Sequence, residues 1–393
     1  MRILARTPRM VMFMAGSLFL AGGAYAQPAA SLATLEIALP ITEPARTRME
    51  PAQARGPDLS VMTYNVKGLP WPIATGRADA LERIADRLAR MRKDAVQPAV
   101  VVLQEAFRSE AKSIGDRAGY RYQIVGARAQ RVANPVSRRA PLRRRSAAPQ
   151  LDSGLIVLSD FPIVEVDRAA FPKGACAGMD CFAAKGVVLV TLDVPGKGRV
   201  EIATTHLNSK GASWAPEKET ERAYREQVDF LVDFLRSNRN PAIPLILAGD
   251  FNLGDREERL AILPPALTRL NGGLAPSEAL RGCIDADFMP DVHSDDAQWV
   301  LERARDMQYV LPGDRRTVAA VAASIPFGTE TGGEPLSDHF GYTIEYRLTA
   351  PAGMLASRDK TPVAARPNVS VASMPVPHRS TGQSDEQAAI RAN

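Results

Sequence analysis

The chain has 393 residues, of which 45% are hydrophobic and 24% are charged. This composition is typical of a globular protein and argues against a collagen-like, coiled-coil or polytopic membrane protein. The formal net charge of +5 comes from the two ends, because residues 27–349 hold 41 basic and 41 acidic residues. The high isoelectric point is therefore no argument that the folded body binds nucleic acid.

The N-terminus is predicted to be a signal peptide over residues 1–26. Three arginines in the first nine residues precede an apolar run at 11–20, and Ala24-Tyr25-Ala26 fits a cleavage site. The apolar run is short for a membrane span. We therefore expect export, to the periplasm or out of the cell.

Export makes a disulfide plausible, although three cysteines are too few for a disulfide scaffold. Cys176 and Cys181 are close enough in sequence to bridge across a short loop, which leaves Cys283 over. We expect the Cys176–Cys181 bridge.

Composition divides the rest of the chain into a linker, a folded body and a tail. Residues 27–57 are rich in Ala and Pro and are predicted to be a disordered linker, and residues 350–393 a disordered tail. The catalytic domain is expected at 58–349. Within it, residues 127–150 hold seven arginines and no acidic residue. This segment is either a solvated loop or a patch that attracts membrane lipid or nucleic acid.

Short apolar runs alternate with helical patterns in the body. Eight runs predict strands, at Leu59–Val66, Ala99–Gln104, Tyr120–Val125, Ser153–Leu158, Val187–Leu192, Val200–Thr205, Leu245–Ala248 and Tyr342–Arg347. Apolar residues at helical spacing predict helices over Arg77–Arg92 and Glu217–Arg236.

Polar side chains stand at the ends of these apolar runs, where a rigid sheet can present them to a shared cleft. They comprise carboxylates for a hard cation, amides for phosphate oxygens and two imidazoles for proton transfer or charge stabilisation. The residues are Asn65, Glu105, His206, Asp250, Asn252, Asp338 and His339.

The order of these residues, with Thr205-His206-Leu207, Gly249-Asp250-Phe251-Asn252 and Ser337-Asp338-His339, resembles the endonuclease/exonuclease/phosphatase superfamily. The resemblance implies an α+β fold, a four-layered α/β/β/α sandwich with two packed mixed β-sheets and the site at one mouth of the sheets.

A narrower resemblance is to the bacterial neutral sphingomyelinases. It is carried by Asn65–Pro70, Gly76–Asp79, Phe171–Cys176 and Lys185–Val187. The chain departs from that branch in two places. Residues 317–336 offer only Ile325-Pro326-Phe327 where those enzymes carry an aromatic hairpin, and Asp306 is followed by Met where an Asp-Tyr pair is expected.

The expected reaction is in-line attack of water on a phosphodiester. His339 would be the general base, oriented by Asp338 and by Asp306. Mg²⁺ would bind Glu105 with help from Asn65. By resemblance, Asp250 and Asn252 would lie near the attacking water and the phosphate.

On the substrate side, Asn252 and His206 would bind the phosphate, and His206 would stabilise its developing charge. Lys173 and Lys185 would contact the head group, although both also fit solvated surface charges.

The sequence thus predicts an exported, Mg²⁺-dependent phosphodiesterase of phospholipase C type. Its expected substrate is sphingomyelin, cleaved to ceramide and phosphocholine at a peripheral membrane surface by a monomer. Two alternatives stay open. One is an exported nuclease on the same fold, and the other is a membrane-binding module without catalysis.

Overall fold

The computed structural model describes residues 56–128, 149–255, 257–286, 295–331 and 333–349. The predicted signal peptide, the tail, nearly all of the linker and most of the Arg-rich segment lie outside the described residues. In the described part of the chain, no helix has the length and apolar character needed to cross a bilayer.

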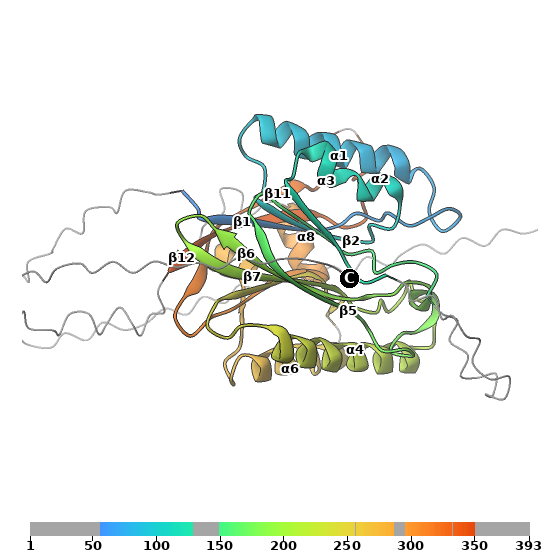
Figure 1. Ribbon diagram of the computed structural model, residues 1–393. Coiled ribbons are helices and arrows are strands. Elements are labelled where there is room, and N and C mark those ends of the chain that lie inside the picture. The colour runs from blue at the N-terminus through green and yellow to red at the C-terminus, as the bar shows by residue number, and fades with distance from the viewer. Residues whose placement is uncertain (1–55, 129–148, 256, 287–294, 332, 350–393) are drawn as a thin grey trace, which may run out of the picture. The chain divides into compact units, whose positions relative to one another are not determined.

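Two six-stranded sheets form the centre of the fold (Figure 1). The first has the order β11 (Thr317–Phe327), β12 (Gly341–Thr349), β1 (Leu59–Asn65), β2 (Val100–Gln104), β4 (Ile156–Ser159) and β3 (Tyr122–Val125). The second has the order β5 (Ile163–Ala170), β6 (Gly186–Val194), β7 (Gly198–His206), β8 (Leu245–Asp250), β10 (Asp306–Leu311) and β9 (Ser277–Glu278). Both sheets are mixed, because β1 pairs with β2 and β7 with β8 in parallel while the other pairs are antiparallel.

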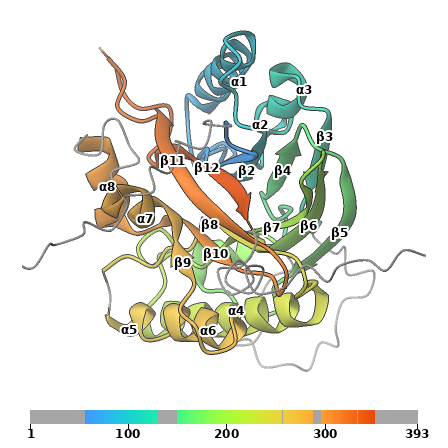
Figure 2. The same cartoon turned by 90° about the vertical axis from the view of Figure 1, so that its left-hand side faces the viewer.

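Helices cover the outer face of each sheet (Figures 1 and 2). On the first sheet lie α1 (Arg77–Lys93), α2 (Ser109–Lys112) and α3 (Ile114–Ala118). On the second lie α4 (Glu217–Asn238) and α6 (Leu263–Leu270), with α5 (Glu257–Leu260) beside them. Two more helices, α7 (Ala279–Asp285) and α8 (Asp295–Arg303), pack at the β9–β11 end.

The inner faces of the two sheets meet in one apolar core. Val61 of β1 and Val102 of β2 belong to the same buried cluster as Val190 of β6 and Ile246 of β8. The neighbouring Met62 points the other way, to the cluster under α1, as the two-residue period of a strand requires. This arrangement confirms the expected α+β, four-layered sandwich.

The predicted elements agree with the structure where the pattern is strong. Both predicted helices begin at their predicted residues, Arg77 and Glu217. The eight predicted strands are present with ends shifted by a few residues. Four strands were missed: β5, β9, β10 and β11. Charged residues occupy the outer strand β5, and β11 is rich in Ala, so neither sequence has a clear strand period.

A buried carboxylate in β7 makes the stability of the fold depend on pH. Glu201 is 1% exposed, and Oε2 of its carboxylate has no hydrogen-bond partner among the described residues. Burial raises the pKa of Glu201 to about 7, against the hydrogen bond from the backbone N–H of Asn240. Because this pKa exceeds that of the unfolded chain, the folded state binds the proton more tightly. Stability is therefore lost as pH rises from the unfolded value through about 7.

We expect Glu201→Gln to raise the free energy of unfolding at pH 8 by about 2 kcal/mol, and to have little effect at pH 4. Urea unfolding at the two pH values measures the difference. The exposed Glu334→Gln, whose charge is not among those that shift the pKa of Glu201, is the matched control and should change neither value. An equal effect of Glu201→Gln at both pH values would contradict the titration argument.

Candidate active site

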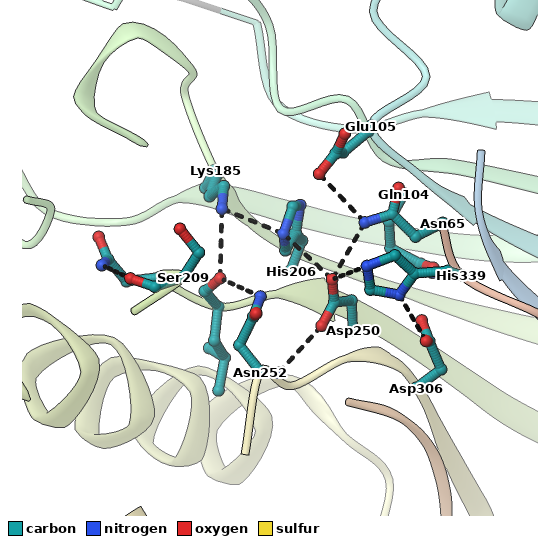
Figure 3. Close-up of polar contacts among 12 residues, drawn as sticks. Asn65, Gln104, Glu105, Lys185, His206, Ser209, Asp250, Asn252, Asp306 and His339 are labelled. Carbon is teal, nitrogen blue, oxygen red and sulfur yellow. Dashed lines mark hydrogen bonds and ion pairs between the residues drawn. The ribbon is translucent and has the colours of Figure 1, made fainter. Parts of the chain in front are cut away.

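Six strand ends meet at one edge of the two sheets. β1 ends at Asn65 beside Gln104 of β2, whose chain continues into Glu105. In the second sheet, His206 at the end of β7 and Asp306 at the start of β10 both pair with Asp250 at the end of β8. Figure 3 shows these side chains, with His339 from the segment before β12, pointing toward one another. The structure therefore brings together the strand-end residues that the sequence predicted.

Asn65 joins a carboxylate of each sheet. Its Nδ2 donates to Glu105 Oε1 at 3.1 Å and to Asp250 Oδ2 at 3.0 Å (Figure 3). Its Oδ1 accepts from the backbone N–H of Lys67 at 3.0 Å, which fixes the orientation of the amide. Asn65 thus links the two carboxylates through its N–H groups, and its side-chain oxygen is directed away from them.

His339 is held by a carboxylate distant in sequence. Its Nδ1 lies 2.6 Å from Asp306 Oδ2, and its Nε2 lies 3.9 Å from Asp250 Oδ2. Burial alone would lower the pKa of His339, but Asp306 and Asp250 outweigh it and raise this pKa to about 9. The two contacts fix the orientation of the ring: Nδ1 is bonded to Asp306, and Nε2 is directed toward Asp250 and the cavity.

Asp338 has a different position from the one expected. Its half-exposed carboxylate pairs with Lys67 Nζ at 3.2 Å, and no hydrogen bond joins it to the ring of His339. The reason is local geometry: the main chain of Ser337–His339 turns inward, with the Ser337 hydroxyl donating to the Asn65 carbonyl at 2.7 Å. Asp306 rather than Asp338 orients the imidazole.

The second imidazole is neutral. Burial, with the Lys185 ammonium, lowers the pKa of His206 to about 4. Its Nε2 lies 3.1 Å from Lys185 Nζ and 3.4 Å from Asp250 Oδ2, and its Nδ1 is buried without a hydrogen-bond partner in the described structure. The ammonium of Lys185, and not the ring of His206, thus supplies the positive charge at this place.

Lys185 is held by a residue that the sequence analysis missed. Its Nζ pairs with Asp180 Oδ1 at 2.9 Å, and Asp180 Oδ2 accepts from the Ser209 N–H at 2.6 Å. Asp180 lies inside the loop closed by the expected Cys176–Cys181 disulfide, which the structure confirms, with an S–S distance of 2.07 Å. The sequence did offer a signal for Asp180: it lies between the two cysteines expected to bridge, five residues before Lys185-Gly186.

Several site residues have left-handed backbone, which is uncommon outside glycine and often marks functional sites. The φ angles are 55° at Glu105 and 46° at Asn252. A Cβ at Gly68 would lie 2.5 Å from the carbonyl oxygen of Glu105, so this glycine permits the close approach of the two loops.

Asn252 is fixed by its neighbours. Its N–H donates to Asp250 Oδ1 at 2.9 Å and its Nδ2 to the Leu207 carbonyl at 3.1 Å. The fully buried Arg259, which the sequence analysis also missed, donates to the Asn252 carbonyl and pairs with Glu221 at 3.0 Å.

These groups open into a cavity of about 670 Å³. The site residues that line it are Glu105, Lys185, His206, Asp250, Asn252, Asp338 and His339. Asn65 and Asp306 do not line the cavity, but they hydrogen-bond to Glu105 and His339, which do. Lys173 is exposed and lines a second cavity, which Lys185 also lines but none of the other predicted site residues does.

The site offers donors that suit a divalent cation. Ligand atoms of Asp250, Asp306 and His339 all lie within 4.8 Å of one another. Burial raises the pKa of Glu105, whose carboxylate accepts one hydrogen bond, from Asn65. The ionised form of a partly buried carboxylate with so little compensation is favoured by a nearby cation. Carboxylate oxygens are the ligands of hard cations such as Mg²⁺, so the residues present fit the expected metal.

The class of protein follows from this geometry. It is an α/β/β/α sandwich that carries a carboxylate-held imidazole, buried carboxylates and orienting amides at one mouth of its two sheets. The chain belongs to the Endonuclease/Exonuclease/phosphatase family, whose sequence model matches residues 62–339. The family expected from the sequence is thereby confirmed.

Individual proteins similar to this chain have related names. An inositol phosphosphingolipids phospholipase C of Schizosaccharomyces pombe is 26% identical over 51% of this chain and 42% of its own length. A sphingomyelinase of Mycobacterium tuberculosis is 24% identical over 75% of this chain and 53% of its own length. The chain therefore spans about half the length of these relatives. Among solved structures, a Staphylococcus aureus beta toxin variant with bound magnesium ions is 16% identical, covers 73% of this chain and 99% of its own, and has a TM-score of 0.49.

Proposed function

We propose that the protein is a Mg²⁺-dependent phosphodiesterase of phospholipase C type that cleaves sphingomyelin to ceramide and phosphocholine. The observation that carries the proposal is the His339 imidazole, bonded to Asp306 at 2.6 Å and facing Asp250 at the floor of the cavity. A carboxylate-held imidazole is an acid–base group. The neutral form of the ring, which a pKa of about 9 makes the minor form at neutral pH, can take a proton from a water on the cavity side of its Nε2.

The other residues divide between the water and the phosphate. Asp306 holds His339 in one orientation and stabilises the imidazolium that forms when the proton arrives. Asp250 lies between the two imidazoles and would orient the attacking water. Lys185, next to His206 and lining the cavity, would meet the charge that develops on the phosphate oxygens.

Glu105 and Asp250, on either side of the Asn65 amide, would hold the metal ion. When bound, Mg²⁺ would supply neutralisation of the charge on the phosphate and the leaving oxygen. Asn65 keeps its two carboxylates at a fixed separation for this purpose.

The charge of the cavity supports a lipid substrate over a nucleic acid. Five basic and six acidic residues line it. A polyanion is bound by an excess of basic residues, whereas a zwitterionic head group needs none. The names of the two relatives, both of which refer to sphingolipids, support the same choice.

The decisive experiment offers the purified protein sphingomyelin vesicles and, separately, plasmid DNA, with Mg²⁺ and then with EDTA. We expect phosphocholine release that EDTA abolishes and no DNA cleavage. DNA cleavage without phosphocholine release would support the nuclease alternative. Cleavage of neither substrate would support a membrane-binding module without catalysis.

We also propose that the protein acts outside the cytoplasm. The N-terminal sequence pattern motivates this proposal, and the Cys176–Cys181 disulfide supports it, because such bonds persist in oxidising compartments. Immunoblots of periplasmic, medium and cytoplasmic fractions test it, and a full-length chain confined to the cytoplasm would contradict it.

Asp180 is expected to act as a positioning residue for Lys185. The variant Asp180→Asn keeps an acceptor for the Ser209 N–H but removes the charge that holds the ammonium at 2.9 Å. We expect kcat to fall by about 10-fold to 100-fold, because a displacement of about 1 Å at the phosphate is enough for such a loss. Phosphocholine release measures it, with the exposed Asp193→Asn as control. Unchanged kcat in Asp180→Asn would remove this role.

A further inference from the structure

Exposed aromatic side chains gather at the mouth of the catalytic cavity. Within the described residues, three aromatic side chains are exposed by more than a third: Trp71 (75%), Phe182 (41%) and Trp214 (83%). Phe182 and Trp214 line the cavity together with the 49% exposed Ile73. Trp71 lies two residues before Ile73 in a turn closed by the bond from the Ile73 N–H to the Pro70 carbonyl.

The four side chains, which we call the apolar rim, come from three loops that are well fixed. Phe182 follows the Cys176–Cys181 bridge, and Trp214 lies between β7 and α4. These two loops are joined by a 2.7 Å hydrogen bond from the Met179 N–H to the Ser213 carbonyl. Aromatic side chains on fixed loops lose little conformational entropy when they bind.

The segment between the last two strands does not supply such a surface. Phe327, at the end of β11, is fully buried and packs on the Tyr64 ring with centroids 4.9 Å apart. The apolar rim is therefore the exposed aromatic surface of the described structure that adjoins the cavity.

The rim and the cavity together have the polarity profile of a lipid–water interface. Amphipathic aromatic rings are favoured at the head-group level of a bilayer. Below the rim, the cavity is close to neutral, with five basic and six acidic lining residues, which matches a zwitterionic head group. We propose that Trp71, Ile73, Phe182 and Trp214 dock the mouth of the cavity on the surface of a bilayer of zwitterionic phospholipid. The proposal rests on the proposed function, since it concerns how that substrate reaches His339.

The test uses the tryptophans themselves as reporters. The chain has three, and the third, Trp299, is stacked on Phe340 with ring centroids 4.0 Å apart. The full-length His339→Gln protein, in EDTA, is mixed with phosphatidylcholine vesicles so that binding is measured without turnover. We expect the tryptophan emission to shift to shorter wavelength and the protein to sediment with the vesicles. Adding Trp71→Ser and Trp214→Ser should weaken sedimentation by at least about tenfold.

A matched double variant, Val96→Ser with Leu274→Ser, removes two exposed apolar side chains that do not line the cavity. It should bind vesicles as the parent does. Absence of binding by the parent, equal loss in both double variants, or binding to DNA in place of vesicles would overturn the docking surface. Because no hydrolysis is measured, failure of the sphingomyelinase assay leaves this result intact. Conversely, undiminished vesicle binding by the Trp71→Ser, Trp214→Ser variant would overturn the docking surface while the proposed reaction stands.

Discussion

Turnover of sphingomyelin should fall by about 10³-fold when His339 is replaced by Gln, the range expected for loss of a general base. Gln can still donate to Asp306 from its side-chain amide, so the buried carboxylate keeps a partner and the fold should persist. What is lost is the imidazole Nε2 that faces Asp250. The measurement is kcat for phosphocholine release, with the unfolding temperature recorded for each variant.

Two companion variants make this prediction specific. His378→Gln lies outside the described residues, in the segment predicted from sequence to be a tail, and should retain full turnover. Asp306→Asn removes a carboxylate that raises the pKa of His339 to about 9. Its removal lowers that pKa, so the ascending limb of kcat against pH should move to lower pH while the maximum rate falls. An unshifted limb in Asp306→Asn, or full activity in His339→Gln, would refute the assignment of the base.

Replacing Glu105 by Gln should remove most of the response to Mg²⁺. The variant keeps the size of the side chain and an acceptor for Asn65, but it lacks the charge that offsets a divalent ion. At low millimolar Mg²⁺ we expect a loss of roughly 10³-fold in turnover, about 4 kcal/mol of transition-state stabilisation. Titrating Mg²⁺ into the EDTA-treated proteins and following phosphocholine release gives the affinity and the maximum rate separately.

The exposed Glu82→Gln on α1 is the control for this loss of one negative charge, and its Mg²⁺ curve should overlay that of the parent. Calorimetric titration with Mg²⁺ alone gives a readout independent of turnover. If Glu105→Gln bound Mg²⁺ as tightly as the parent, the ion would have to be held at Asp250, Asp306 and His339 without Glu105.

The strand-end residues could be predicted because carboxylates, amides and imidazoles follow several apolar runs in one order, although a single polar residue in such a place is more often part of a turn. Asn65, Glu105, His206 and Asp250 were found in this way, and the parallel pairs β1–β2 and β7–β8 bring them to one edge. The central strands could be predicted because a strand that is buried on both faces has an unbroken run of apolar residues.

Contacts that depend on the pairing of distant strands could not be predicted. Both Asp338 and Asp306 were expected to orient His339, but the sequence could not decide between them: Asp306, 33 residues earlier, bonds to the ring, and the neighbouring Asp338 pairs with Lys67 instead. That choice is made by the position of β10 beside β8, and β10 itself has no clear strand pattern. The charge state of His206 likewise depends on its burial between the two sheets and on the neighbouring ammonium of Lys185.

The amide of Asn65 spans the seam between the two sheets, with its carboxylate partners 40 and 185 residues away in sequence. Neither sheet alone contains a full set of reacting groups. The proposed hydrolysis therefore requires both sheets to be in place, and we expect it to appear only after the contacts between β1, β2 and β8, distant in sequence, have formed.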